Sequence, residues 1–136
     1  MRTFLVVFTL ALASLTGHAE GLSLQLHGAS HHVNAKRTFN EANLGLGLRY
    51  QQSNTVSFQG GFYDNSVNKT TVYLLAQWEP LSLGSFRAGV FGGVASGYQL
   101  PVVAGGMVSY KAITLRVIPK TPKTPLTFGL EVGIPF

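Results

Sequence analysis

The chain has 136 residues, of which 46% are hydrophobic and only 11% are charged, and its mean hydropathy is positive at +0.23. This composition excludes a disordered or acidic solvating chain, and the length fits a single domain. The absence of cysteine excludes a disulfide scaffold, a thiolate nucleophile and a cysteine zinc site. The formal net charge of +5 is spread thinly along the chain, which does not support nucleic-acid binding.

The amino-terminal segment has the features of a secretory signal peptide. Arg2 precedes an apolar run over residues 4–15, and Gly17 and Ala19 are the small residues typical of a cleavage site. We therefore expect cleavage after Ala19, which leaves residues 20–136 as the exported domain. An anchoring helix needs about 20 consecutive apolar residues, and the run ends too early for that alternative.

The rest of the sequence alternates between apolar residues and small or polar ones, segment after segment. The last segment is the clearest, because every second residue from Leu126 to Phe136 is apolar. A period of two is the signature of a β-strand. Eight strands are expected, near residues 22–27, 44–51, 56–63, 71–78, 86–95, 102–110, 112–118 and 126–136.

Eight strands with such complete apolar faces, in an exported chain, predict an all-β fold: an eight-stranded antiparallel transmembrane β-barrel. The apolar face would meet lipid, and closure of the barrel would leave no unpaired strand edge in the bilayer. A soluble barrel would need a charged outer face, which these strands lack. The terminal Phe136 also resembles the ending of outer-membrane barrel proteins. We therefore expect a monomer in the outer membrane of a Gram-negative bacterium.

The lengths of the connections predict the orientation, because such barrels have short periplasmic turns and longer outer loops. The connections near 52–54, 80–85 and 111 are short, whereas 28–43, 64–70, 96–101 and 119–125 are longer and more polar. The longer connections are therefore assigned to the cell surface. Basic residues in the first of them could contact lipid phosphates or could simply be solvated.

The inward face is predicted to be small and apolar near the cell surface, and polar nearer the periplasm. An eight-stranded barrel is only just filled by its own side chains, so glycines in the outer half would create a pocket. An acyl chain could occupy this pocket, whose expected lining is Gly45, Gly47, Gly61, Tyr63, Gln77, Phe91, Gly105 and Met107. The alternative is that the glycines only ease strand curvature. Interior arginines and glutamates are expected to form a paired structural network, made of Arg49, Arg87, Arg116, Glu79 and Glu131.

The outer rim of this pocket contains the residues best suited to catalysis. His27 is expected at the end of the first strand, and Asp64, Asn65 and Ser66 follow Tyr63 in a loop. A histidine near a serine hydroxyl, oriented by a carboxylate or amide, can promote acyl transfer because the imidazole accepts the hydroxyl proton. Loops are also rich in Asp, Asn and Ser for conformational reasons alone, so an ordinary turn is the alternative.

A metal site is the other chemistry that the histidines suggest. His27, His31 and His32 fall within six residues of one another, but a fourth ligand with a suitable spacing is missing. No metal or other cofactor is therefore expected.

One long segment carries a resemblance to a known family. Residues 62–69, running on to Glu79, resemble the stretch of the lipid A palmitoyltransferase family that has the sequence Phe-x-Asp-Ser-Trp-Asn-Lys and ends in Gly-Trp-Glu. His27 lies about as far ahead of Asn40-Glu41 as the family's catalytic histidine lies ahead of its Asn-Glu-Arg-Pro. Further agreement in order is found at residues 45–48, 100–102 and 117–119, so the resemblance covers nearly the whole mature chain at low identity.

The resemblance implies an outer-membrane enzyme that transfers an acyl chain from a phospholipid to lipid A on the cell surface. It implies His27, Asn65 and Ser66 as catalytic residues. Asn65 departs from the family because it stands in place of an aspartate and cannot ionise, so Asp64 is a candidate substitute. Two other readings stay open: a deacylase of lipid A or phospholipid, and a non-catalytic barrel that binds lipid or presents loops.

The resemblance has three further implications for lipid handling. Pro101 and Pro119 match prolines that flank a lateral lipid gate, and proline lacks the N–H that a β-ladder requires. Gln77 replaces the family's glycine that sets the depth of the acyl pocket, which implies a chain shorter than palmitate. The family's leading amphipathic helix has no counterpart here, since only Glu20 and Gly21 precede the first expected strand.

Overall fold

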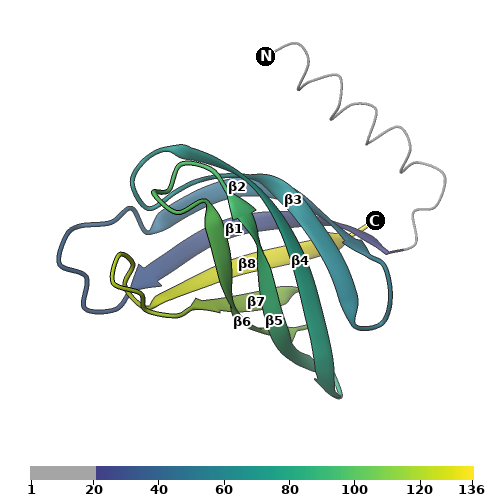
Figure 1. The fold of residues 1–136 in the computed structure, drawn as a ribbon. Coiled ribbons are helices and arrows are strands. Elements are labelled where there is room, and N and C mark those ends of the chain that lie inside the picture. The colour runs from purple at the N-terminus through teal and green to yellow at the C-terminus, as the bar shows by residue number, and fades with distance from the viewer. Residues whose placement is uncertain (1–20) are drawn as a thin grey trace, which may run out of the picture.

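The computed structural model describes residues 21–136, so the predicted signal peptide at residues 1–19 lies outside the described residues. Residues 21–136 form one closed antiparallel β-barrel (Figure 1), which confirms the predicted all-β, eight-stranded fold. The strands are β1 (Leu22–His32), β2 (Ala42–Gln51), β3 (Val56–Asp64), β4 (Thr70–Leu83), β5 (Phe86–Ala95), β6 (Val102–Tyr110), β7 (Ile113–Ile118) and β8 (Thr127–Pro135). No helix in this part of the chain is long and apolar enough to cross a membrane.

Each strand pairs with its neighbours in the sequence, and β1 pairs with β8 to close the barrel. Ser23 lies opposite Pro135 in this closing pair, and the same register places His27 opposite Glu131. Closure therefore leaves no free sheet edge and joins residues that are farthest apart in the sequence.

The outward face of the barrel is apolar, and the inward face contains most of the polar residues. In β4, for example, Val72 and Leu74 are each 60% exposed, whereas Thr71, Tyr73 and the following alternate residues are buried. Large exposed apolar side chains occur on every strand from β2 to β8. This distribution is the reverse of that in a soluble barrel, whose apolar residues point inward.

The predicted network of interior charges is confirmed. Nη2 of Arg49 lies 2.7 Å from Oε1 of Glu131, and Nη2 of Arg116 lies 2.9 Å from the same oxygen. Arg87 pairs with Glu79 at 3.5 Å. The side chain of Gln59 is completely enclosed among these groups and donates a hydrogen bond to Glu131.

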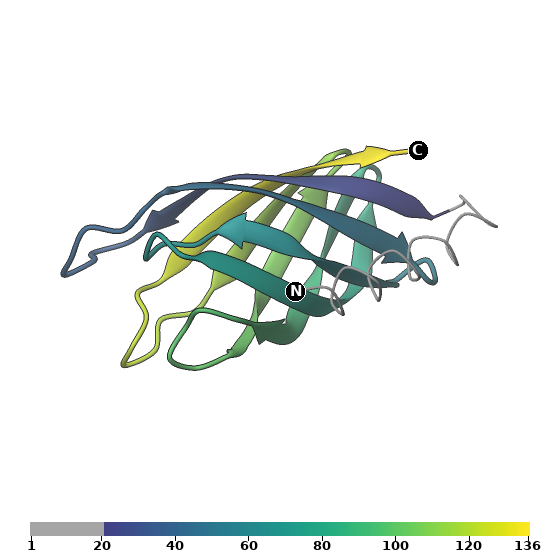
Figure 2. The ribbon, with the colours of Figure 1, turned by 90° about the horizontal axis from the view of Figure 1, so that it is seen from above.

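The long and short connections lie at opposite ends of the barrel, as predicted. Connections 33–41, 65–69, 96–101 and 119–126 lie at one end, which we call the loop end (Figure 2). The start of β1, the carboxyl terminus and the short turns 52–55, 84–85 and 111–112 lie at the other. The turn after β4 contains Gly84 at φ +58, a conformation that glycine adopts without steric cost.

The first strand is longer than predicted, because it continues to His32 instead of ending at residue 27. The first loop is consequently 33–41 and not 28–43. A β-bulge causes the difference: His27 pairs with Glu131 but Ala29 pairs with Leu130, so Gly28 is an extra residue in β1. The alternation shifts by one residue at the bulge, which a search for a strict period of two does not detect. His27 therefore lies in the middle of β1 and not at the rim.

The interior glycines provide a test of how closely the strands pack. A Cβ added at Gly61 would lie 2.5 Å from Cα of Gly47 on the next strand, whereas one added at Gly129 would meet nothing within 4 Å. We expect Gly61→Ala to destabilise the barrel by about 1–3 kcal/mol, as overpacking does, and Gly129→Ala to leave stability nearly unchanged. Urea unfolding of the two variants in micelles measures the difference, and equal midpoints would contradict it.

Candidate functional site

A cavity of about 120 Å³ lies inside the barrel toward its loop end. Its lining has two chemically different sides. Polar side chains come from β1, β2, β8 and the loop after β3: His27, Ser30, Asn43, Ser66, Thr127 and Glu131. Apolar side chains come from β4 to β7: Leu75, Phe91, Ala95, Val103 and Ile118. Within residues 21–136, Arg116 of β7 is the one charged residue among them. The cavity is therefore amphipathic from side to side.

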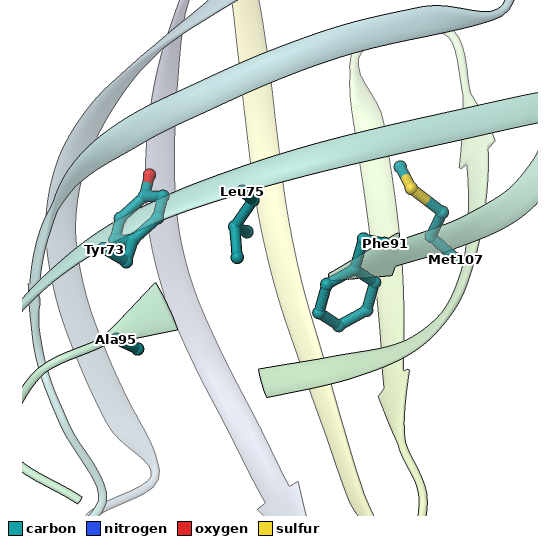
Figure 3. Close-up of a cluster of buried hydrophobic side chains, with 5 residues drawn as sticks. All are labelled: Tyr73, Leu75, Phe91, Ala95 and Met107. Atoms are coloured by element: carbon teal, nitrogen blue, oxygen red, sulfur yellow. The ribbon is translucent and has the colours of Figure 1, made fainter. Parts of the chain in front are cut away.

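The apolar side is part of the main hydrophobic cluster of the barrel. Tyr73, Leu75, Phe91, Ala95 and Met107 form this cluster, and Figure 3 shows their side chains on β4, β5 and β6. The neighbouring residues Tyr63, Tyr98, Val103 and Ile118 pack against it. An alkyl chain in the cavity would thus contact side chains that are already packed against one another.

His27 forms the centre of the polar side and is held at both ring nitrogens. Its Nδ1 lies 3.4 Å from Oε2 of Glu131, and its Nε2 lies 2.6 Å from the hydroxyl of Tyr73. That hydroxyl accepts a hydrogen bond from Gln59, so its own proton is directed at Nε2. Nδ1 then carries the ring proton and faces the Glu131 carboxylate, which leaves Nε2 as the basic nitrogen.

The carboxylate that orients His27 is Glu131, a role that the sequence analysis did not assign. The closing register of β1 with β8 makes the two residues direct partners. Counting inward from the start of β1 and from the carboxyl terminus reveals the pairing, because His27 is the fifth residue after Leu22 and Glu131 is the fifth before Phe136. The antiparallel closure of the predicted barrel was therefore the signal that could have identified it.

The three predicted loop residues have separate environments. Asn65 is fully buried, and its Oδ1 accepts hydrogen bonds from the backbone N–H groups of Val67 and Lys69 at 3.0 and 2.9 Å. The side chain of Asp64 is exposed. Asn65 thus stabilises the loop 65–69, and neither residue orients His27.

Ser66 shares the cavity lining with His27, as the sequence analysis expected. Its carbonyl oxygen accepts a hydrogen bond of 2.8 Å from the backbone of Asn40, which ties the loop after β3 to the first loop. Within residues 21–136, no hydrogen bond joins Ser66 to His27. A substrate group would have to lie between them.

Of the residues predicted to line the acyl pocket, Tyr63 and Phe91 do so, and the other six do not. The space left by the glycines is filled: Cβ atoms at Gly45, Gly47, Gly61 and Gly105 would meet neighbouring backbone, the Cβ of Tyr63, the hydroxyl end of Tyr73 or the ring of Phe91. Gln77 is buried deeper and donates a hydrogen bond to Gln59, and Met107 is buried in the hydrophobic cluster. Gly129 does line the cavity, and a Cβ added there would meet nothing within 4 Å, so this glycine leaves space open.

The first loop folds back on the end of β1 through Glu41. Its carboxylate accepts a hydrogen bond from the backbone N–H of His32 at 3.1 Å, which lowers the pKa of Glu41 below its usual range. His31 lies 3.1 Å from the same carboxylate. His27 is turned into the barrel and away from this pair, and the described part of the chain contains no group of three side chains able to hold a metal.

The wall of the barrel is incompletely paired between β6 and β7. Residues of β6 pair with β5 as far as Val102, but pairing with β7 runs only from Gly106 to Tyr110. Pro101 precedes the unpaired stretch of β6, and Pro119 follows the end of β7. Val103 and Ile118, which lie in these two strand ends, line the cavity.

Together these residues supply a basic nitrogen, a hydroxyl group and an apolar space, which is the chemistry required to act on an acyl ester. The chain matches no protein-family model and no curated protein. We therefore infer its function from the side chains of the site.

Proposed function

We propose that the protein is an outer-membrane enzyme that transfers an acyl chain from a phospholipid to lipid A. One observation carries this proposal: His27, oriented by Glu131, faces an apolar cavity that Ser66 also lines. The resemblance to lipid A palmitoyltransferases supplies the reaction class.

The outward face of the barrel supports the membrane location. A closed barrel satisfies its backbone hydrogen bonds internally, and exposed apolar residues such as Leu74 and Trp78 suit contact with lipid chains. With the loop end at the cell surface, the cavity lies at the level of the outer leaflet, where lipid A is found.

In the proposed reaction, Nε2 of His27 is the general base. A hydroxyl of the lipid A sugar attacks the ester carbonyl of the phospholipid and gives its proton to Nε2, while Glu131 stabilises the imidazolium. The Ser66 hydroxyl donates a hydrogen bond to the oxyanion. Collapse of the intermediate returns the proton to the departing lysophospholipid oxygen. Tyr73 must release Nε2 when the acceptor binds, since its hydroxyl occupies that nitrogen.

The unpaired stretch between β6 and β7 gives the acyl chain a route from the bilayer. Without ladder hydrogen bonds, these strand ends can separate at low cost near Pro101 and Pro119. The chain would then lie along Val103, Ile118 and Phe91, on the apolar side of the cavity. We propose this unpaired stretch as the lateral gate that was predicted at Pro101 and Pro119.

A non-catalytic lipid-binding barrel is the second candidate. It is favoured by the hydrogen bond that already engages Nε2 of His27 with Tyr73, because a fully bonded histidine can serve packing alone. A deacylase would use the same groups, with water in place of the sugar hydroxyl.

Mass analysis of lipid A and phospholipid from cells that express the protein tests the proposal. Transfer predicts an additional acyl group on lipid A together with an equal amount of lysophospholipid, and both changes should disappear in His27→Ala and Ser66→Ala. Loss of an acyl group from lipid A, with release of fatty acid, would instead indicate the deacylase. If no lipid changes, both enzymatic functions are contradicted and the non-catalytic barrel is favoured.

A further inference from the structure

The guanidinium of Arg116 has hydrogen-bond donors to spare. This residue of β7 is only 9% exposed, and its Nη2 donates to both Gln59 and Glu131. Its Nε and Nη1 are buried and have no hydrogen-bond partner within residues 21–136. A guanidinium carries five N–H groups, so most of the donors of Arg116 have no acceptor. Burying a donor without an acceptor costs free energy of folding.

The charges around Arg116 do not balance. Arg49 and Arg116 share a single carboxylate oxygen of Glu131, while Glu79 is paired separately with Arg87. The interior network as a whole therefore contains three arginines and only two glutamates. An unbalanced charge in a medium of low dielectric constant is stabilised strongly by a nearby counter-charge.

Arg116 also borders the apolar side of the cavity. Its Cζ lies 4.7 Å from the centre of the Phe91 ring, and the adjoining lining residues Val103 and Ile118 are apolar. An anionic group at Arg116 would thus be continuous with a space suited to a hydrocarbon chain. The cavity volume of about 120 Å³ exceeds that of one water molecule, roughly 30 Å³. A longer chain would have to pass between β6 and β7, beyond Gly106 toward the loop end, where the two strands are unpaired.

We propose that the cavity binds a free fatty acid, with its carboxylate on Arg116 and its alkyl chain along Val103 and Ile118. The carboxylate accepts charge-assisted hydrogen bonds from the unused donors and supplies the missing negative charge. Phe91 covers the guanidinium of Arg116, so the Phe91 ring turns aside when the fatty acid binds. The inference concerns binding alone and does not depend on acyl transfer.

Nuclear magnetic resonance of decanoate, labelled with ¹³C at the carboxyl carbon, tests this in the folded barrel held in nonionic micelles. We expect saturable binding of decanoate, and binding of decanol and decyl phosphate that is weaker by about tenfold or more. Equal binding of decanol would overturn the role of the carboxylate. Tighter binding of decyl phosphate would overturn the assignment to a fatty acid.

Three variants separate direct contact from general electrostatics. Arg116→Met should weaken decanoate binding about tenfold or more, since it removes the donors. Arg49→Met is the matched control, because it also removes one positive charge that pairs with Glu131. Arg49 does not line the cavity, so this variant should weaken decanoate binding less. Phe91→Leu should strengthen binding by uncovering the guanidinium, which keeps the proposal testable if Arg116→Met does not fold. Unchanged binding in Arg116→Met, or weaker binding in Phe91→Leu, would overturn it.

Discussion

Glu131→Gln is expected to destabilise the barrel by about 3–5 kcal/mol, the usual cost of breaking a buried ion pair by removing one partner. The side chain of Glu131 is 2% exposed and accepts hydrogen bonds from Arg49, Arg116 and Gln59. Glutamine has nearly the same shape but no charge, so both guanidinium groups would lose their counter-charge. Urea unfolding in micelles, followed by the fluorescence of the single tryptophan, Trp78, measures the loss.

Two further variants make this result specific. Glu41→Gln removes a carboxylate that is 47% exposed in the first loop, so its effect on stability should be much smaller than that of Glu131→Gln. Replacing Arg49, Arg116 and Glu131 together by Met, Met and Leu should recover most of the stability, because an apolar core of similar volume often matches a buried ion cluster. A loss below about 1 kcal/mol in Glu131→Gln would show that water or nearby dipoles solvate the arginines.

The fold could be predicted because, in a barrel with an apolar outer face and a polar interior, the two kinds of residue alternate along each strand with a period of two. In β8 each alternate residue up to Phe136 is apolar, and no charge interrupts the outward face. The bulge at Gly28 could not be predicted, since a single extra residue leaves the composition of β1 unchanged and only reverses which side chains point inward. The end of β1 was consequently placed too early and His27 too near the rim.

The site was predicted in part, for a related reason. His27 and Ser66 do share a cavity, but Asn65 and Asp64 were candidates for the partner of His27 because the family resemblance places an aspartate next to the serine. Glu131 is more than one hundred residues away in the sequence and becomes a neighbour only through barrel closure. Likewise, sorting glycines by face indicates where a side chain is absent and does not indicate what fills the space; backbone atoms of the neighbouring strands and the hydroxyl of Tyr73 lie there.

The arrangement of the cavity lining changes the orientation that is expected for a substrate. A pocket with a polar floor would take an acyl chain end-on from the cell surface, with its methyl group against charged residues. The cavity instead has its polar side on β1 and β8 and its apolar side on β4 to β7. An ester group facing His27, with its chain leaving toward β6 and β7, satisfies both sides at once.

His27→Ala is expected to reduce the proposed acyl transfer by about 10²–10⁴-fold, the range over which a general base contributes. Ser66→Ala should cost about 10²–10³-fold through loss of one oxyanion donor. His31→Ala is the matched control, because its side chain is 69% exposed on the same strand and lies outside the cavity. Initial rates with purified barrel, short-chain phospholipid and lipid A in mixed micelles measure all three.

Tyr73→Phe then distinguishes a catalytic His27 from a structural one. The change removes only the hydroxyl that occupies Nε2 and keeps the ring that packs in the hydrophobic cluster. If Nε2 is the base, freeing it should preserve the rate or raise it, and the pH dependence of the rate should shift because the imidazole has lost a hydrogen bond. If Tyr73→Phe abolishes transfer as completely as His27→Ala, the hydroxyl of Tyr73 takes part in the reaction, and His27 cannot be the group that contacts the acceptor.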